Sequence, residues 1–299
     1  MTTPSADVQE YDQSTFWVAP ARNFRTSARL HLQHFLFQNT LGYLLEPAVE
    51  KSVASSQPLK VADLACGNGI WLSELHSYLA KNHVSAQLDG FDINPTNFPH
   101  PAYLPATVSL KQLDILAKPL PAELVGIYDV VHIRAFVSVI PDADLTPVLS
   151  VASKLLKPGG YLQWEDSRGD RFIVDSPSPQ ISKVACDTIV QVLKAGGQAK
   201  GITNDWVDVL DTHLDQFGFQ DVRLLMQEKR KQDFKGWTED YLMVWEELAV
   251  FFPPKLQEPN APLSREAWTD LFAQSVKETE AGVVVHQGRI VTAVGKKPL

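Results

Sequence analysis

The sequence predicts an α/β protein built around a mostly parallel sheet. Between residues 59 and 166, short apolar segments alternate with helical segments, which is the pattern of successive βαβ units. A glycine-containing turn joins the first predicted strand to the first predicted helix, and acidic residues follow three successive strands. The 299 residues are enough for one large domain of this type with added elements.

Hydrophobic periodicity defines the expected elements of this region. Strands are expected at Leu59–Leu64, Ala86–Ile93, Thr107–Leu113, Tyr128–Ile133 and Tyr161–Glu165. Helices are expected at Ile70–Ala80 and Asp144–Leu156, and Lys157–Gly160 is interpreted as a turn. The spacing within the first of these helices predicts a buried stripe made of Trp71, Leu75, Tyr78 and Leu79.

The first fifty residues are predicted to form a lid segment and a helix. A helix is expected over Ser27–Glu46, where apolar residues and His34 recur at steps of three and four, and Pro47 is expected to end it. Residues 52–58 are interpreted as a linker to a main domain at 55–299. Phe16 and Trp17 are too apolar for a free tail, so they are predicted either to pack on the core or to cover a substrate.

The C-terminal part is predicted to add helical insertions near residues 175–201 and 234–282. Helices are expected at Gln180–Lys194, Asn204–Phe217, Thr238–Val250 and Ser264–Glu280, a strand at Gln220–Lys231, and a hairpin or strand at Val283–Val294. The aromatic residues of the second insertion, among them Trp237, Tyr241 and Trp245, are interpreted either as helix core or as walls of an apolar substrate pocket. The basic run Lys229–Arg230–Lys231 is interpreted as a solvated strand end.

Composition excludes several classes of protein. The net charge of -8 and the isoelectric point near 5.5 disfavour nucleic acid as a partner, because such binding depends on neutralising phosphates. Two cysteines make no disulfide framework, and no Cys/His spacing predicts a metal site. No apolar run approaches the roughly 20 residues that span a bilayer. The polar N-terminus lacks signal-peptide features, which favours a cytoplasmic location; no feature specifies an oligomeric state.

The turn after the first strand, Ala65-Cys66-Gly67-Asn68-Gly69, indicates a ligand that approaches the main chain closely. A dinucleotide fingerprint would place Gly or Ala three residues after Gly69, but Leu72 stands there. A phosphate-binding P-loop is excluded because no Gly-Lys-Ser/Thr follows. The turn alone remains compatible with an ordinary tight turn.

Acidic residues after the next strands strengthen the ligand hypothesis. Asp92 lies 25 residues beyond Gly67 at the end of the second strand, where a carboxylate can accept both hydroxyls of a ribose. Asp114 follows the third strand. In isolation each could be a surface acid or a helix cap. Together with Asp63 they are predicted to converge on the carboxyl edge of a parallel sheet, where such folds bind ligands.

These motifs, with Tyr-Asp-Val-Val-His at 128–132 and Leu-Leu-Lys-Pro-Gly-Gly-Tyr-Leu at 155–162, resemble class I S-adenosylmethionine-dependent methyltransferases. The resemblance implies a Rossmann-like, seven-stranded, mostly parallel sheet with helices on both faces, and S-adenosyl-L-methionine as cofactor. It places the methionine part at the glycine turn, the ribose at the second strand and the adenine after the third. The implied cofactor-binding residues are Asp63, Ala65, Gly67, Gly69, Asp92, Ile93, Asp114, Ile115 and His132. The family commonly has Gly where this chain has Ala65.

A narrower resemblance, to fungal secondary-metabolism methyltransferases, spans about residues 25–170. It is carried by Arg29-Leu30-x-x-Gln33-His34, Val-His-Ile-Arg at 131–134 and Tyr-Leu-Gln-Trp-Glu-Asp at 161–166. It implies O-, N- or S-methylation of a small molecule. The alternative is a protein that binds the cofactor without methyl transfer, such as a regulator or a cyclase-type enzyme. Acidic charge and the lack of an Asn/Asp-Pro-Pro-Tyr motif disfavour methylation of a nucleic acid.

The chemistry is predicted to centre on His132, at the end of the fourth strand. Its ordinary pKa near 6.5 suits a general base, and a neighbouring cation is expected to lower that pKa; the alternative is a structural histidine. Arg134 is predicted to pair with a substrate acid or with the cofactor carboxylate, and His34 to bind substrate, although each could instead be structural. Trp164, at the end of the fifth strand, is predicted to wall the substrate pocket.

Overall fold

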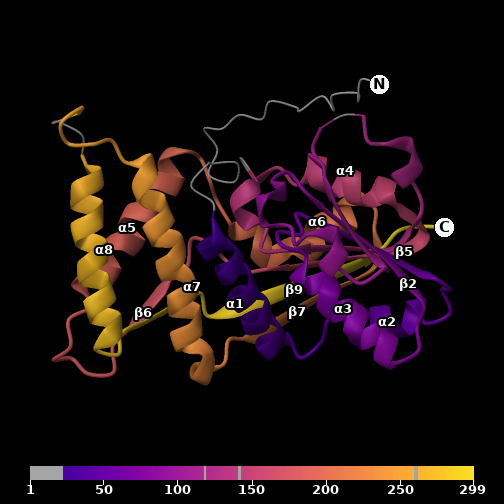
Figure 1. Cartoon of the computed structure of the whole chain (residues 1–299), viewed down its shortest axis with the longest axis horizontal. Helices are drawn as coiled ribbons and strands as arrows, with labels where there is room; N and C mark the ends of the chain where they lie inside the picture. Colours follow the sequence, from indigo (N-terminus) through magenta and orange to yellow (C-terminus); the bar gives the residue numbers. More distant parts are fainter. Residues whose placement is uncertain (1–22, 118, 141–142, 259–261) are drawn as a thin grey trace.

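The computed structural model describes residues 23–117, 119–140, 143–258 and 262–299, and within them a seven-stranded sheet forms the centre of the molecule (Figure 1). The strand order is β3-β2-β1-β4-β5-β9-β7, and within this sheet β9 runs opposite to the other six strands. The strands are β1 (Leu59–Leu64), β2 (Ala86–Asp92), β3 (Val108–Gln112), β4 (Tyr128–Arg134), β5 (Leu156–Asp166), β7 (Gln220–Glu228) and β9 (Arg289–Lys296). The predicted Rossmann-like sheet is therefore confirmed.

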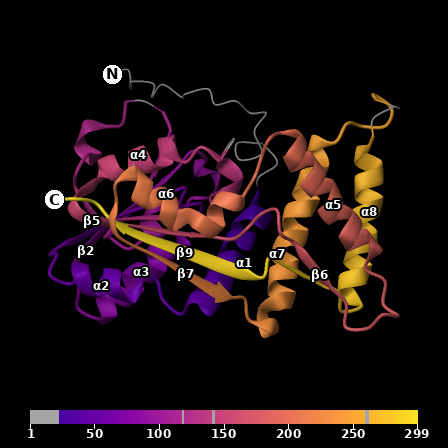
Figure 2. The ribbon, with the colours of Figure 1, turned by 180° about the vertical axis from the view of Figure 1, so that it is seen from behind.

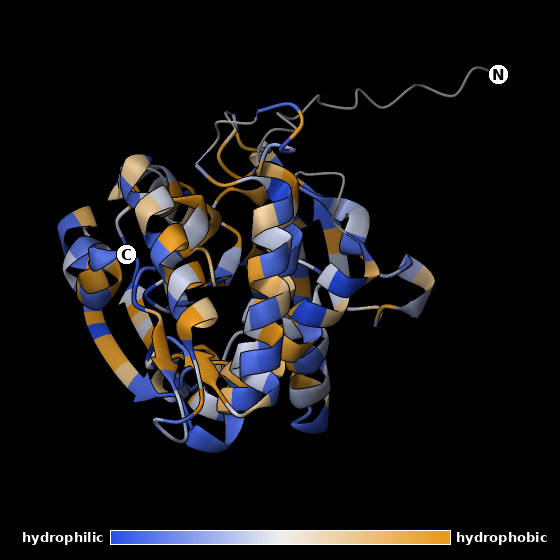
Figure 3. Ribbon diagram, turned by 90° about the vertical axis from the view of Figure 1, so that its left-hand side faces the viewer, coloured by the Kyte–Doolittle hydropathy of each residue, from blue (hydrophilic) through white to orange (hydrophobic). Residues whose placement is uncertain are grey.

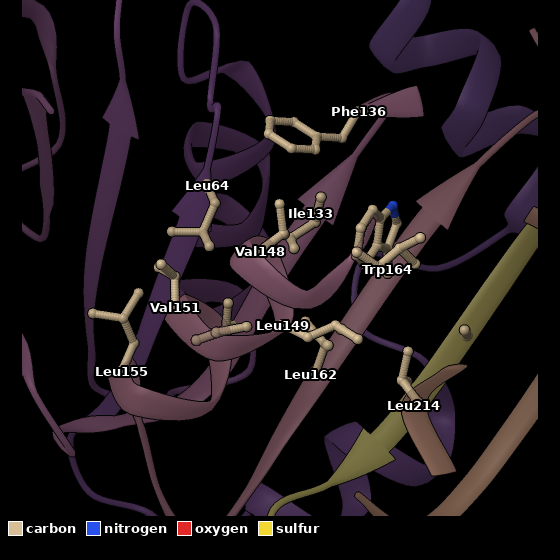
Figure 4. Packing of buried hydrophobic residues seen from close by; sticks show 14 of the residues in the cluster. Leu64, Ile133, Phe136, Val148, Leu149, Val151, Leu155, Leu162, Trp164 and Leu214 are labelled. Carbon is tan, nitrogen blue, oxygen red and sulfur yellow. The ribbon is translucent and has the colours of Figure 1, made fainter. Parts of the chain in front are cut away.

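Helices cover both faces of this sheet (Figures 1 and 2). On one face α2 (Pro47–Val53) and α3 (Ile70–Lys81) bury apolar residues against β1, β2 and β4. On the other face α4 (Thr146–Leu155) and α6 (Leu210–Phe217) close a second core, part of which is seen in Figure 4. The alternation of side chains along each strand assigns neighbouring residues to opposite cores, as with Val130 and Val131.

A third group of helices stands beyond one end of the sheet. It consists of α5 (Val184–Ala199), α7 (Phe234–Glu247) and α8 (Arg265–Glu280), with a two-stranded sheet of β6 (Ile173–Asp175) and β8 (Val284–His286). Helix α1 (Phe24–Leu41) lies between this group and the main sheet (Figure 1). In Figure 3 the helices show apolar stripes beside polar ones, as expected for helices that bury one side. The expected helices at both insertions are thus present, with shifted ends.

The N-terminal helix ends earlier than expected. Gly42 adopts a left-handed conformation with φ 77° and closes α1 by a hydrogen bond from its N–H to the carbonyl of Gln38. Pro47 then begins α2 instead of blocking a helix, because proline lacks only an N–H that the first turn leaves unpaired. The Glu46 carboxylate caps α2 by accepting from Ala48 N and Val49 N. Residues 52–58 are therefore partly helical and not a linker throughout.

Three other local expectations were wrong or only partly confirmed. The Lys157–Gly160 segment belongs to β5, where Gly159 has φ 78° and the register with β4 shifts, so the predicted turn is an irregularity inside a strand. The final segment, expected as a hairpin or strand, forms strands and no hairpin, because β8 pairs with β6 whereas β9 pairs with β5 and β7.

In α3 three of the four residues of the predicted stripe, Trp71, Leu75 and Leu79, are buried. Tyr78 is 38% exposed instead, and the fully buried Leu72 completes the stripe.

In the part of the chain that the structure describes, we find no helix of the length and apolarity that crossing a bilayer requires.

Candidate functional site

The candidate site lies where the strand order changes direction, between β1 and β4. From β1 the chain proceeds to β2 and β3 on one side, and it returns to β4 and β5 on the other. In doubly wound sheets, ligands bind in the crevice outside the carboxyl ends of the strands at such a point, so the candidate site, the switch-point crevice, is placed at the ends of β1 and β4. Asp63 pairs in register with His132 near these ends, and both side chains are buried.

The glycine turn after β1 needs its glycines. Gly67 and Gly69 adopt φ values of 60° and 72°, which side-chain-bearing residues rarely adopt. A Cβ on Gly69 would also lie 2.7 Å from Leu110 Cδ1, and one on Gly67 would lie 3.0 Å from Leu30 Cδ1. The turn is braced by Asp92, whose Oδ2 accepts a hydrogen bond from Gly67 N at 2.8 Å. The predicted partners Gly67 and Asp92 are thus in direct contact.

Ala65 enters the same turn with φ 55°, which explains why glycine is common there in the resembling family. A left-handed alanine is strained by roughly 1–2 kcal/mol, partly offset by the greater unfolded-state freedom of glycine. We expect Ala65→Gly to raise the free energy of unfolding by up to about 1 kcal/mol, and Ala65→Val to lower it by about 2 kcal/mol. Urea denaturation of the three proteins measures this; equal stabilities of the Gly and Val variants would contradict it.

The other predicted cofactor residues lie along the same sheet edge. Asp92 Oδ1 accepts from Asn94 N at 2.8 Å, and Asp114 Oδ1 accepts from Leu116 N at 2.9 Å, so each carboxylate organises the loop behind it. Ile93 is half-buried, whereas the Ile115 side chain packs in the core on the α4 face. Their contacts with a cofactor remain predictions.

His132 is enclosed by carboxylates and an indole. Its Nδ1 lies 2.7 Å from Asp63 Oδ1, its Nε2 lies 3.5 Å from Glu165 Oε2, and its ring stacks on Trp71 at 3.7 Å between centroids. The side chain is 1% exposed. Burial by itself would lower the pKa of His132, but the two carboxylates outweigh it and raise that pKa above 6.5. The expectation of a lowered pKa was therefore wrong, because the neighbours that matter are acids.

Arg134 and His34 continue this polar network towards α1. Arg134 Nε donates to Glu165 Oε2 at 2.6 Å, and Arg134 Nη1 lies 3.1 Å from His34 Nδ1. Because a guanidinium can only donate, His34 Nδ1 must accept, which leaves the proton of the neutral ring on Nε2. Burial, and then the charge of Arg134, lower the pKa of His34 to about 3. Both predicted substrate residues thus reach the same edge, held by Glu165.

Trp164 does not wall a pocket at this edge. It is fully buried, its Nε1 donates to Asp166 Oδ2 at 3.2 Å, and its ring packs 5.5 Å from that of Trp206 (Figure 4). Strand alternation is the reason: Gln163 contacts the segment after α1 and Glu165 contacts His132, so Trp164 between them faces the α4 core. The predicted substrate role of Trp164 was wrong.

Helix α1 closes over the glycine turn, a contact that the sequence did not reveal. Asn68 Nδ2 donates to the carbonyl of Ser27 at 3.2 Å and lies 2.8 Å from His31 Nδ1. A cavity of about 540 Å³ opens beside this contact, between the start of α1, the start of α3 and residues 95–104. Asp63, Asp92 and His132 do not line it, so it adjoins the switch-point crevice without being that crevice. Phe16 and Trp17, predicted to cover the site, lie outside the described residues.

A second buried polar cluster joins α7 to the end of β7. Lys229 is 4% exposed; its Nζ donates to Tyr241 Oη at 3.0 Å and lies 3.6 Å above the Trp237 ring. The interpretation of this lysine as a solvated strand end was wrong, because α7 folds over it. Burial, opposed only in part by Asp240 and Asp166, lowers the pKa of Lys229 to about 7.

This lowered pKa makes folding stability depend on pH with a defined sign. Between the folded pKa near 7 and the unfolded value of 10.5, the unfolded chain binds one more proton, so stability rises with pH. We expect Lys229→Met to flatten the rise between pH 7 and 9, which for one proton is at most about 1.4 kcal/mol per pH unit. Urea midpoints at four pH values measure it; parallel curves for both proteins would contradict the assignment.

Among the described residues, no group of three or more His, Cys, Asp or Glu side chains is placed to hold a metal ion. The crevice instead combines a glycine turn with carboxylates at the ends of β1 and β2 and another after β3, which is suited to an organic ligand. It suits a ligand with hydroxyl and amine groups and no phosphate.

Comparisons with known proteins agree with this geometry. Residues 61–160 match the family model described as a methyltransferase domain. Methyltransferase grgD from Penicillium sp is 30% identical over 58% of this chain and 59% of its own. N-methyltransferase verN from Clonostachys rogersoniana is 29% identical over 54% of this chain and 53% of its own. The chain thus spans between half and three fifths of the length of these relatives.

A solved structure of phosphoethanolamine N-methyltransferase 2 from Haemonchus contortus is 16% identical, covers 95% of this chain and 61% of its own, and has a TM-score of 0.48. A likeness of that size is weak, so the fold assignment rests on the strand order and on the matched segment. That segment runs from β1 into β5 and includes the glycine turn, Asp92 and His132. Residues 61–160, about a third of the chain, therefore match the methyltransferase domain family. The described sheet is seven-stranded and mostly parallel, as the resemblance to class I methyltransferases implies.

Proposed function

We propose that the protein transfers a methyl group from S-adenosyl-L-methionine to a small-molecule acceptor, a secondary metabolite, and that the acceptor atom is nitrogen. The observation that carries the proposal is the braced glycine turn at the switch point, with Asp92 holding Gly67 N at 2.8 Å. Asp92 would hold the ribose, Asp63 and the turn the methionine end, and Asp114 the adenine. The names of relatives such as verN, and of tcpN from Claviceps purpurea, which is 32% identical over 48% of this chain, support a nitrogen acceptor.

The surroundings of His132 also favour nitrogen. Both of its ring nitrogens face carboxylates and its pKa is raised, so it is poorly suited to take a proton from a hydroxyl. The cofactor supplies an electrophilic methyl group with a good leaving group. An amine-type nitrogen with a free lone pair needs orientation more than a base, and orientation can contribute about 7–11 kcal/mol to the barrier. The residues of the crevice would then hold the cofactor, orient the acceptor and exclude water.

Release of S-adenosylhomocysteine tests the proposal. Purified protein and labelled S-adenosylmethionine are incubated with neutral and basic nitrogen compounds, phenols and thiols, and labelled product is separated. We expect transfer to nitrogen acceptors, with one S-adenosylhomocysteine per methyl group. Tight cofactor binding without transfer to any compound would favour the alternative of a non-methylating binding protein, and transfer confined to phenols or thiols would refute the nitrogen assignment.

A further inference from the structure

Buried polar atoms without a hydrogen-bond partner gather around α1. Donors of this kind are Arg29 Nε, His34 Nε2 and Trp237 Nε1, and acceptors are Gln38 Oε1, Gln227 Oε1 and Asp240 Oδ1. Three stand on α1, two on α7 and one on β7, and α1 packs against both of these elements. Buried polar groups in proteins almost always have partners, so such a concentration marks a place where a partner is missing.

The donor at His34 is defined by its chemistry. Since Arg134 occupies Nδ1, the unpartnered Nε2 carries the proton and must meet an acceptor. The side chain is 3% exposed, and Trp237 and Asp240 are 1% and 0% exposed. Arg29, another of the three donors, approaches Asp240 Oδ1 with its Nη1 only to 3.8 Å, which is beyond a hydrogen bond.

A series of contacts joins these groups to the polar network around His132. The Arg134 guanidinium lies 5.1 Å from the centroid of the Phe37 ring, whose own centroid is 5.5 Å from that of Trp237. Flat apolar walls and polar atoms therefore alternate from Glu165 at the end of β5 to α7. Arg134 faces Glu165 and Arg29 faces Asp240, and the third cation, Lys229, donates to Tyr241 Oη and lies above the Trp237 ring. Each of these cations thus has a partner already, and a charged ligand would be left unpaired there.

We infer that the junction of α1, α7 and the end of β7 binds the methyl acceptor, and that this acceptor is a neutral, flat molecule carrying both hydrogen-bond donors and acceptors. This inference rests on the proposed function, because it places the acceptor next to the cofactor crevice. Entry requires α1 to lift from α7. The outer end of α1 is held by the exposed Arg25–Glu246 pair, which resists separation weakly, and by a hydrogen bond from Thr26 Oγ1 to Glu247 Oε1 at 2.7 Å. Further along α1, the buried contact of Leu36 and Phe37 with Trp237 has to open as well.

Three probes that share one ring but differ in charge test the inference on protein saturated with S-adenosylhomocysteine. N-acetyltryptophanamide is neutral and carries two amides, N-acetyltryptophan is an anion, and tryptamine is a cation; all three share one ring. By calorimetry we expect the neutral probe to bind at least ten times more tightly than either charged one. Equal or tighter binding of a charged probe, or no binding of the neutral probe, overturns the inference.

Two variants remove single donors. Trp237→Phe keeps an aromatic ring without the N–H, and His34→Asn keeps an acceptor for Arg134 but moves its N–H donors away from the position of His34 Nε2. Each should weaken the neutral probe about tenfold with S-adenosylhomocysteine affinity within twofold, whereas Lys235→Gln on the exposed side of α7 should change neither. Wild-type affinity for the neutral probe in both donor variants would overturn the inference. Failure of the wild type to bind S-adenosylhomocysteine would instead refute the proposed function.

Discussion

His132→Ala is expected to lower the free energy of unfolding by about 3–5 kcal/mol, the cost of removing the central partner from a buried ionic network. The substitution leaves Asp63 and Glu165 buried with the imidazole gone, and it removes the ring that stacks on Trp71 at 3.7 Å. Because the folded pKa of His132 is raised, its contribution is complete below pH 6.5 and declines as pH rises through the folded pKa. Urea denaturation should therefore show a larger difference between wild type and variant at pH 6 than at pH 9.

His132→Gln separates this holding role from general-base catalysis. Glutamine can donate one hydrogen bond to a carboxylate but takes no proton at neutral pH. We expect the Gln variant to keep turnover within about tenfold of wild type, whereas loss of a general base costs roughly 10²–10⁴-fold. A loss in that larger range, with S-adenosylhomocysteine affinity unchanged and the acidic limb of the pH profile gone, would restore His132 as the base.

Asp92→Ala should weaken S-adenosylhomocysteine binding by about 1–3 kcal/mol, roughly 5- to 150-fold. Two effects add. The variant loses the charge-assisted hydrogen bonds proposed to the ribose, and it releases Gly67 N and Asn94 N, which Asp92 holds at 2.8 Å each. Isothermal calorimetry measures the affinity directly.

Asp144→Ala is the matched control, because the exposed Asp144 accepts from the backbone N of Thr146 at 3.0 Å in the same manner, and no cofactor contact is predicted for it. We expect it to bind S-adenosylhomocysteine as the wild type does. Equal affinities for the Asp92 variant and this control would show that the ribose is held elsewhere.

The sequence alone determined the parts of the molecule whose causes are local. The strand at Leu59–Leu64 was predicted to the residue, because a short apolar run bounded by turn residues has few other solutions. The contact between Gly67 and Asp92 was foreseeable for a related reason, since successive parallel strands bring the residues after them to one edge. Pattern and spacing thus predicted the mostly parallel sheet and the edge at which a ligand is proposed to bind.

Tertiary structure decided what depends on neighbours distant in sequence. The pKa of His132 is set by Asp63 and Glu165, and Lys229 is buried because α7 covers it. Trp164 faces the α4 core through the pairing register of β5, which a single sequence does not specify residue by residue. Burial and charge around a side chain are sums over segments that only folding brings together, so they become readable only once the chain is folded.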